Sequence, residues 1–296
     1  MNQSHYKQKC FWLIALFFTT AGIFISLYSA QSHYKNYTDP LYSSFCALSR
    51  SINCDTVAQS PWSIIMGVPV AWWGFLFYLT FFFLLLIENY RSLQTWRILF
   101  YISLLASAIS LGLAGIALWK IKSLCLVCLA TYALTFALTY TCWIGKRRIK
   151  ETLHTSNEPE TDSGITKNIR RNYGLACFIF FTGILCLYFF LPRYWDIASS
   201  TTDISTIPHG LTEEGHPWIG AVEPQLTITQ FSDYQCFQCN KMHFYLRQLL
   251  LRHPDTLRLV HRNYPMDHAV NPKVVPEPFH EGSGHLAKIA ILAAAR

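Results

Sequence analysis

Long apolar runs separated by short polar stretches dominate the first two thirds of the chain. A helix that crosses a bilayer needs about 20 mostly apolar residues, and five segments reach or approach that length. The pattern therefore predicts five transmembrane helices, the last of them ended by Pro192. The five segments lie at residues 11–30, 67–87, 98–119, 124–145 and 173–191.

The first apolar run also admits a second interpretation, as a cleaved signal peptide. The run is long for that purpose, and Tyr28 fits poorly before a cut at Ala30. We therefore expect a retained helix, and in either case residue 31 emerges on the far side of the membrane.

Beyond residue 220 the pattern changes to that of a soluble α/β domain. Residues 225–231 alternate as a half-buried strand does, and residues 257–261 fit a second strand. Residues 236–252 fit a helix, and residues 285–296 begin another. Strands that alternate with helices predict an α/β fold for this part of the chain.

The organisation that follows has five parts. Residues 151–164 are polar and predict a linker, and residues 196–220 are rich in Ser, Thr, Gly and Pro, which is typical of a flexible tether. We expect a four-helix transmembrane domain at 1–145, a basic cytoplasmic linker at 146–172, a fifth transmembrane helix at 173–192, an extracytoplasmic tether at 193–220 and a partial α/β domain at 221–296.

Composition supports a membrane protein. Hydrophobic residues make up 52% of the chain and charged residues 14%, whereas a soluble domain carries about 25% charged residues. This excludes disorder and a coiled coil, and it disfavours a wholly soluble protein.

Basic residues gather in one stretch between helices. The net charge is +7, which in a soluble protein would suggest a nucleic-acid partner. Because loops rich in Lys and Arg stay in the cytoplasm, the stretch 146–172 places the N-terminus inside. It places loop 31–66, the turn 120–123 and everything after residue 192 outside. Topology accounts for the charge, so we expect a lipid bilayer and no nucleic acid. The basic residues of the stretch are Lys146, Arg147, Arg148, Lys150, Lys167, Arg170 and Arg171.

Six of the ten cysteines fall on the predicted outer side, in three pairs close in sequence. That compartment permits disulfides. The other four, which lie in or beside apolar helices, are interpreted as small packing residues. The outer pairs are Cys46 and Cys54, Cys125 and Cys128 (CLVC), and Cys236 and Cys239 (CFQC); the remaining cysteines are Cys10, Cys142, Cys177 and Cys186.

A CxxC motif can be half of a zinc site, a structural feature or a redox pair. Zinc needs four converging ligands, which the loop pair and CLVC together could supply. Leu, Val and Ala surround CLVC, and no His lies nearby. A site with four thiolates at the edge of a bilayer would also be poorly solvated, so we expect no metal.

The CFQC motif follows a strand pattern and opens a helix. The N-terminus of a helix presents free N–H groups and a partial positive charge, which stabilise a thiolate. We therefore predict that the pKa of Cys236 falls from about 8.5 toward or below 7. Cys239, one turn further in, suits the role of resolving thiol.

At this point two resemblances emerge. The string FSDYQCFQCNKMH resembles the active-site segment of the DsbA-like branch of the thioredoxin fold, and Asn263-Tyr264-Pro265 fits that branch. Residues 41–145 resemble the bacterial form of the vitamin K epoxide reductase family. The elements that match are Cys46 and Cys54, Asp55, Ser60, the Gly67-Val68-Pro69 and Gly74 run, and CLVC followed by Tyr132.

The resemblances imply a fold. We expect a membrane all-α bundle, with a four-helix core and a fifth transmembrane helix, followed by an α/β thioredoxin-like domain. No counterpart of the cis-proline loop stands out, and only 76 residues follow position 220. We therefore expect the thioredoxin-like fold to be incomplete at its C-terminus. The pair Phe237-Gln238 also departs from the dipeptide of the strongest oxidants.

The same resemblances imply a relay of thiol–disulfide exchanges that ends on a quinone of the ubiquinone or menaquinone type. The outer domain oxidises exported client proteins with free thiols, and Cys236 then reacts with Cys46, the outer loop cysteine. Cys54 reaches Cys125, and Cys128, one turn deeper, faces the membrane quinone pool. The location implied is the bacterial cytoplasmic membrane, crossed several times, with the thioredoxin-like domain on the periplasmic side.

Four further residues are candidates for the quinone pocket. Tyr132 lies one helical turn after Cys128. Ser60 resembles a family residue of the loop, but it also suits the N-cap of a helix that begins at Pro61. Trp73 and Phe77, together with Trp72, are placed to line the pocket or to face lipid or the core.

Three function classes remain open. The first is a quinone-dependent thiol–disulfide oxidoreductase that generates disulfides. The second is a transmembrane carrier of reducing equivalents, which needs cysteines reachable from the cytoplasm. The third is a non-enzymatic membrane protein with structural disulfides.

Overall fold

The computed structural model describes residues 2–39, 41–48, 51–88, 90, 92–156, 163–195, 207–276 and 279–294. The chain divides into two compact units, Met1–Arg193 and Tyr194–Arg296. Each unit has its own core and is described by itself.

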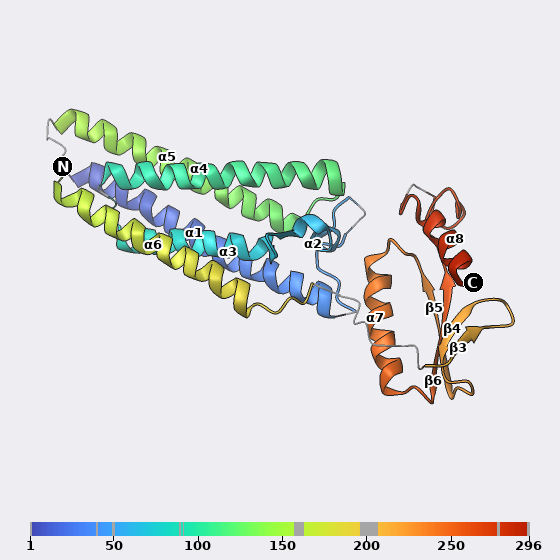
Figure 1. The fold of residues 1–296 in the computed structure, drawn as a ribbon. Helices are drawn as coiled ribbons and strands as arrows, with labels where there is room; N and C mark the ends of the chain where they lie inside the picture. The colour runs from blue at the N-terminus through green and yellow to red at the C-terminus, as the bar shows by residue number, and fades with distance from the viewer. Residues whose placement is uncertain are drawn as a thin grey trace. The chain divides into compact units, whose positions relative to one another are not determined.

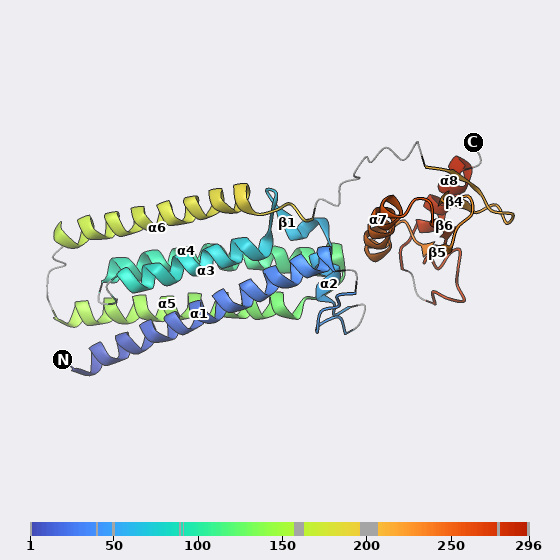
Figure 2. The same cartoon turned by 90° about the horizontal axis from the view of Figure 1, so that it is seen from below.

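Five long helices lie side by side in the first unit and run alternately up and down (Figures 1 and 2). α1 packs against α3 and α5, α4 packs against α5, and α6 packs against α3. All five are long and apolar enough to cross a membrane, which confirms the predicted spans. The helices are α1 (Asn2–Thr38), α3 (Val70–Ile87), α4 (Leu93–Ile116), α5 (Leu126–Ser156) and α6 (Ser163–Phe190).

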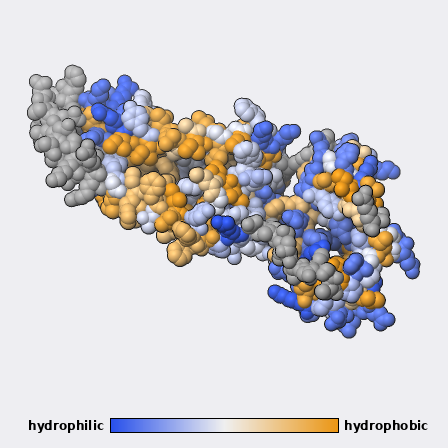
Figure 3. All heavy atoms as spheres, viewed as in Figure 1, coloured by the Kyte–Doolittle hydropathy of each residue, from blue (hydrophilic) through white to orange (hydrophobic). Residues whose placement is uncertain are grey.

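Apolar side chains cover much of the visible surface of this unit (Figure 3). Its core is aromatic, with Trp96, Tyr78 and Phe81 among the largest fully buried side chains. A Cβ atom on Gly145 would collide with the Trp96 ring, so only glycine lets α5 approach that ring so closely. Because lipid is as apolar as the core, close packing of this kind, rather than burial from water, holds membrane helices together.

The helices extend beyond their apolar runs. α5 continues to Ser156 and α6 begins at Ser163, so residues 151–156 and 163–164 of the predicted linker 151–164 are helical. Polar residues continue a helix readily where it leaves the bilayer, and composition alone does not mark that end. The predicted turn at 120–123 is a short π-helical segment, η2 (Ala117–Ile121), closed by Lys122 in the left-handed region at φ 56°.

The segment between α1 and α3 holds a few short elements. They are α2 (Cys54–Ala58), the 3-10 turn η1 (Pro61–Ser63), and the hairpin β1 (Ile64–Ile65) with β2 (Val68–Pro69). Met66 and Gly67 form the hairpin turn at positive φ, 53° and 75°.

The second unit is a mixed α/β fold around a four-stranded sheet of order β3-β4-β6-β5. β5 and β6 are parallel and are joined through α7, whereas β4 pairs with both β3 and β6 in antiparallel fashion. The predicted strands and helices of this region are confirmed. Their bounds are β3 (His209–Leu211), β4 (Pro217–Gly220), β5 (Leu226–Ser232), α7 (Phe237–Arg252), β6 (Leu257–Asn263) and α8 (Ser283–Ala294).

The predicted tether, 193–220, is too long. Residues 209–220 form a β-hairpin that extends the sheet, and residues 196–206 lie outside the described residues. The turn residues of the hairpin produced the linker-like composition, while Trp218 and Ile219 supply the apolar side chains of a strand. The Trp218 ring also lies 4.3 Å from the Arg258 guanidinium on β6.

Candidate functional site

The loop cysteines are joined. Cys46 and Cys54 form a disulfide with Cα atoms 5.6 Å apart. Cys54 is the first residue of α2, whose N-cap is Asn53; the Asn53 side chain accepts hydrogen bonds from the backbone N–H groups of Asp55 and Thr56. A capped helix start of this kind holds the Cys54 backbone in a defined place.

A buried carboxylate ties the loop to α1. Asp55 is 7% exposed. Its Oδ1 accepts a hydrogen bond from Asn36 Nδ2 at 2.9 Å, and its Oδ2 accepts one from the backbone N–H of Ser44 at 3.0 Å. A buried charge needs such partners, because an unpaired one is costly. Asp55 therefore holds both arms of the loop, the Ser44 side and the Cys54 side, against α1.

Backbone hydrogen bonds dock the loop onto the segment that leads into α5. Ile52 forms a parallel bridge with Leu124. The Asn53 N–H donates to the Leu124 carbonyl at 2.9 Å, and the Leu124 N–H donates to the Ser51 carbonyl at 2.8 Å. Cys125 follows directly, so this short ladder brings Cys54 beside Cys125. Cys46, Cys54 and Cys125 belong to one buried cluster, with Cys128 packed against it.

The CLVC cysteines form a second disulfide, with Cα atoms 5.2 Å apart. Cys125 precedes the first residue of α5, and its sulfur accepts a hydrogen bond from the Cys128 N–H at 3.1 Å. The disulfides Cys46–Cys54 and Cys125–Cys128 occupy the four sulfurs that a zinc site would use. Within the described ranges, no group of three or more His, Cys, Asp or Glu side chains is arranged to hold a metal ion.

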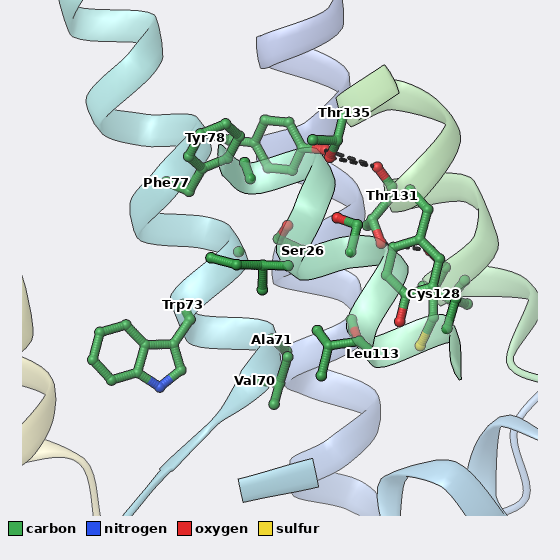
Figure 4. A pocket seen from close by; sticks show the side chains of 18 of the residues that line it. Ser26, Val70, Ala71, Trp73, Phe77, Tyr78, Leu113, Cys128, Thr131 and Thr135 are labelled. Carbon is green, nitrogen blue, oxygen red and sulfur yellow. Dashed lines mark hydrogen bonds between the residues drawn. The ribbon is translucent and has the colours of Figure 1, made fainter. Parts of the chain in front are cut away.

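A cavity of about 550 Å³ opens beside these disulfides, within the usual size range of ligand sites. All five long helices contribute to its mostly apolar wall, and Figure 4 shows part of it. The structure brings seven of the predicted site residues to this wall, whereas Cys46 and Trp72 do not line it. The seven are Cys54, Cys125, Cys128, Ser60, Tyr132, Trp73 and Phe77.

Hydrogen bonds fix several groups of the wall. Ser60 stands at the N-cap of η1 but makes no side-chain cap bond; its hydroxyl donates to the Val57 carbonyl at 2.7 Å. Ser60 thus occupies the N-cap position that was one of its two interpretations, but its side chain does not cap the helix. Trp73 Nε1 donates to the Ile65 carbonyl at 3.2 Å, which anchors the indole on the β1–β2 hairpin. On α5, the Thr131 carbonyl accepts from the Tyr78 hydroxyl at 2.9 Å (Figure 4).

The expectation that Cys46 is the outer, reachable sulfur differs from the structure. Cys46 is 0% exposed and Cys54 is 6% exposed. The Ser44 hydroxyl lies 3.6 Å from the Cys46 sulfur. Sequence order placed Cys46 further from the helices, but in the structure Cys46 is packed in one buried cluster with Cys54 and Cys125.

Sequence reasoning missed two residues of this region. His33 on α1 lines the cavity, is 4% exposed, and has its Nε2 3.3 Å from Ser63 Oγ. Asn36, one turn later, is fully buried and binds Asp55. A signal existed, because polar residues with a spacing of three to four positions at the end of an apolar run mark a face that packs against protein.

The second CxxC lies at the start of α7. Cys236 is the N-cap residue, and its sulfur accepts a hydrogen bond from the Cys239 N–H at 3.4 Å. Both thiols are free and half-buried. The hydrogen bond between the two sulfurs lowers the pKa of Cys239 to about 6, against the effect of burial, with help from the Ser232 hydroxyl; the same bond raises the pKa of Cys236. The prediction had assigned the low pKa to Cys236 and considered only the helix N-terminus.

A buried carboxylate also lies close to this motif in the chain. Asp233 is 3% exposed, and its Oδ2 lies 3.1 Å from His280 Nδ1. Burial works to raise the pKa of Asp233, but hydrogen bonds from the backbone N–H groups of Met266 and Gln235, together with the neighbouring Ser283 and His280 side chains, outweigh it and lower the pKa. The carboxylate thus ties the segment before the CxxC to the loop that precedes α8.

The comparison with known families adds one finding. The model of the vitamin K epoxide reductase family matches residues 13–143. The matched range runs from α1 into α5 and contains both disulfides and most of the cavity wall. This family implies membrane redox chemistry of disulfides and oxidoreductase activity. Residues 13–143 are a domain of the vitamin K epoxide reductase family.

Proposed function

We propose that this protein is a quinone-dependent thiol–disulfide oxidoreductase that generates disulfides in exported proteins. The observation that carries the proposal is the contact of two disulfides at one end of a large apolar cavity. Electrons enter at Cys236 and Cys239, pass through the loop pair to Cys125 and Cys128, and leave on a quinone. The CxxC at a helix start in a parallel β5–α7–β6 unit supports a thioredoxin-like role for the second unit.

The transfer inside the membrane unit takes two exchanges, each an attack of a thiolate on a disulfide. With the loop pair reduced, the Cys54 thiolate attacks the Cys125 sulfur, which breaks the Cys125–Cys128 bond and releases the Cys128 thiolate. The Cys46 thiolate then attacks Cys54. The Cys46–Cys54 disulfide forms again, and Cys125 and Cys128 are left as a dithiol with two electrons and two protons.

A quinone bound in the cavity would accept those two electrons and two protons. The residues present fit such a molecule, because the wall is mostly apolar and the Cys128 sulfur lines it. Tyr132 and Ser60 supply hydroxyls to the same wall. Cys125 stays in contact with the loop pair. Cys125 therefore receives electrons from the loop pair, and Cys128 delivers them to the quinone.

Transfer from the second unit requires the loop to open. Cys46 and Cys54 are buried, so a partner thiolate reaches Cys46 only after the loop that carries it moves. Because both units belong to one chain, the two pairs meet at a high effective concentration. In this proposal the N-terminus lies inside and the second unit lies on the periplasmic side of a bacterial cytoplasmic membrane.

The test is quinone reduction by the purified full-length protein, supplied with a reduced client peptide. Loss of quinone absorbance, with one disulfide formed per quinone consumed, is the expected result. A protein whose thiols stay reduced and whose quinone stays oxidised would be a membrane protein with structural disulfides. Reduction of Cys236 and Cys239 that depends on cytoplasmic thioredoxin would instead indicate a carrier of reducing equivalents.

A further inference from the structure

Helix α6 contributes to the cavity although it lies outside the family match. The match ends at residue 143, and α6 begins at Ser163. Four of its residues nevertheless line the cavity, and they follow one another on one face of the helix with the spacing expected of adjacent turns. The four are Tyr173, Ala176, Cys177 and Phe180.

Two contacts fix where α6 lies along α3. A Cβ atom on Gly183 would lie 2.6 Å from Leu76 Cδ2, so glycine allows a close approach at that level. At the other end, Asn172 Nδ2 donates to the Ile87 carbonyl at 3.5 Å. The cavity-lining residues of α6 fall between these contacts, and they are therefore level with the C-terminal half of α3.

This part of α6 is packed against protein rather than left to lipid. Ala176 is 4% exposed and belongs to the main buried cluster of the bundle, and Tyr173 packs against that cluster. By contrast, Phe181 and Leu185 on the same helix are 67% and 58% exposed. One face of α6 thus closes the side of the cavity, and the other faces outward.

The thiols lie at the opposite end of the cavity. Cys125 and Cys128 stand at the start of α5, beside the loop. Along α3 the cavity wall runs from Val70 to Leu84, about 21 Å at 1.5 Å per residue. A one-ring or two-ring quinone head in contact with Cys128 occupies only part of that length. The remaining half, walled by α6, is mostly apolar, which suits a hydrocarbon chain.

We infer that α6 is the wall of a tail-binding half of the acceptor cavity, so that the prenyl tail of a ubiquinone- or menaquinone-type acceptor lies against Tyr173, Ala176 and Phe180. The inference rests on the proposed function, because it assumes that a quinone head meets Cys128. Ala176 is the residue that sets the space for the tail: its small side chain is buried where α6 meets the bundle.

The experiment compares two quinones with the same head, one with a prenyl tail and one without, as substrates of the full-length protein. Ala176→Trp should raise the KM for the tailed quinone about tenfold or more, the scale on which an apolar pocket discriminates, and leave the tailless quinone within about twofold. Leu185→Trp, on the outward face, is the matched control and should change neither. Phe180→Ala removes a wall contact without adding bulk, and it should raise the KM for the tailed quinone alone.

A second readout does not depend on turnover. A tailed quinone with a photoreactive group at the end of its tail should attach to the peptide that contains residues 173–180. Equal effects of Ala176→Trp and Phe180→Ala on both quinones, or attachment only elsewhere, would overturn the inference while wild-type turnover upholds the proposed function. If the wild-type protein reduces neither quinone, the proposed function fails and the inference fails with it.

Discussion

The two CxxC segments share a local design and differ in what surrounds them. In each, the first cysteine immediately precedes a helix and its sulfur accepts the N–H of the second, at 3.1 Å for Cys125 and 3.4 Å for Cys236. The membrane pair is a disulfide packed against a second disulfide and a cavity. The other pair is a half-buried dithiol beside charged and hydroxyl groups.

This comparison indicates that the two motifs share a local geometry, and that their surroundings determine which partner each pair can react with. In either place a backbone N–H at the helix start donates to the sulfur of the first cysteine. In the proposed relay, the place of the Cys125–Cys128 pair beside the apolar cavity gives it access to a lipid-soluble acceptor. In the same proposal, partial exposure lets the Cys236–Cys239 pair react with protein clients.

The largest effect is expected when one cysteine of the membrane pair is replaced and the other is kept. Cys128→Ser should lower the rate of quinone reduction to background, because the proposed relay then lacks the thiol that meets the acceptor, yet a Cys54–Cys125 mixed disulfide should still form. Quinone absorbance and non-reducing peptide mapping measure the two effects. Cys186→Ser, which changes an exposed cysteine of α6 that does not line the cavity, is the control. Turnover by the Cys128 variant would make Cys125 the thiol that meets the quinone.

A second experiment tests how the two regions meet. Cys239→Ser should accumulate a mixed disulfide between Cys236 and Cys46, because the resolving thiol is absent. Peptide mapping after acid quench identifies the partner sulfur. The burial of Cys46 predicts slow formation, which a destabilised loop, as in Asp55→Asn, should accelerate. Linkage of Cys236 mainly to Cys125 would show that the loop pair is bypassed.

Much of this arrangement could be predicted from the sequence, for physical reasons. Membrane spans are set by length and apolar content alone, and CFQC between a strand and a helix follows from local pattern. The burial of Cys46 could not be predicted, since it depends on the backbone ladder at Ile52 and Leu124, which pairs segments far apart in the chain. The pKa order of the CFQC thiols likewise depends on the Ser232 side chain and on which sulfur donates to the other.

The dithiol pair should show its own titration. Because the pKa of Cys239 is lowered to about 6, the rate of its alkylation should rise about tenfold per pH unit below that value and level off above it, as the thiolate fraction does. An ordinary cysteine, with a pKa near about 8.5, would still be gaining reactivity at about pH 8. Mass spectrometry of the peptide 236–240 after timed iodoacetamide labelling gives the profile. If the alkylation of Cys236, and not that of Cys239, has its pH midpoint near this value, the lowered pKa belongs to Cys236.

The smallest expected effect comes from the carboxylate below that pair. The Asp233 charge opposes ionisation of Cys239, whereas its backbone N–H favours it. Asp233→Asn removes the charge and keeps the backbone, so the Cys239 midpoint should move to lower pH, by less than about one unit, or about 1.36 kcal/mol. Asp255→Asn, an exposed site of the same unit, makes the same change of charge and should leave the midpoint in place.

The side chain of Asp233 also accepts the hydrogen bonds that hold the segment before the CxxC. An amide accepts hydrogen bonds less strongly than a carboxylate does, so the effect of charge must be separated from a loosening of that segment. Thermal unfolding that is the same in Asp233→Asn and in the wild-type protein would show that the segment keeps its place. A midpoint that moves upward would show that Asp233 acts through the positioning of Ser232 and Cys236, and that its charge has little part in setting the two CxxC pairs apart.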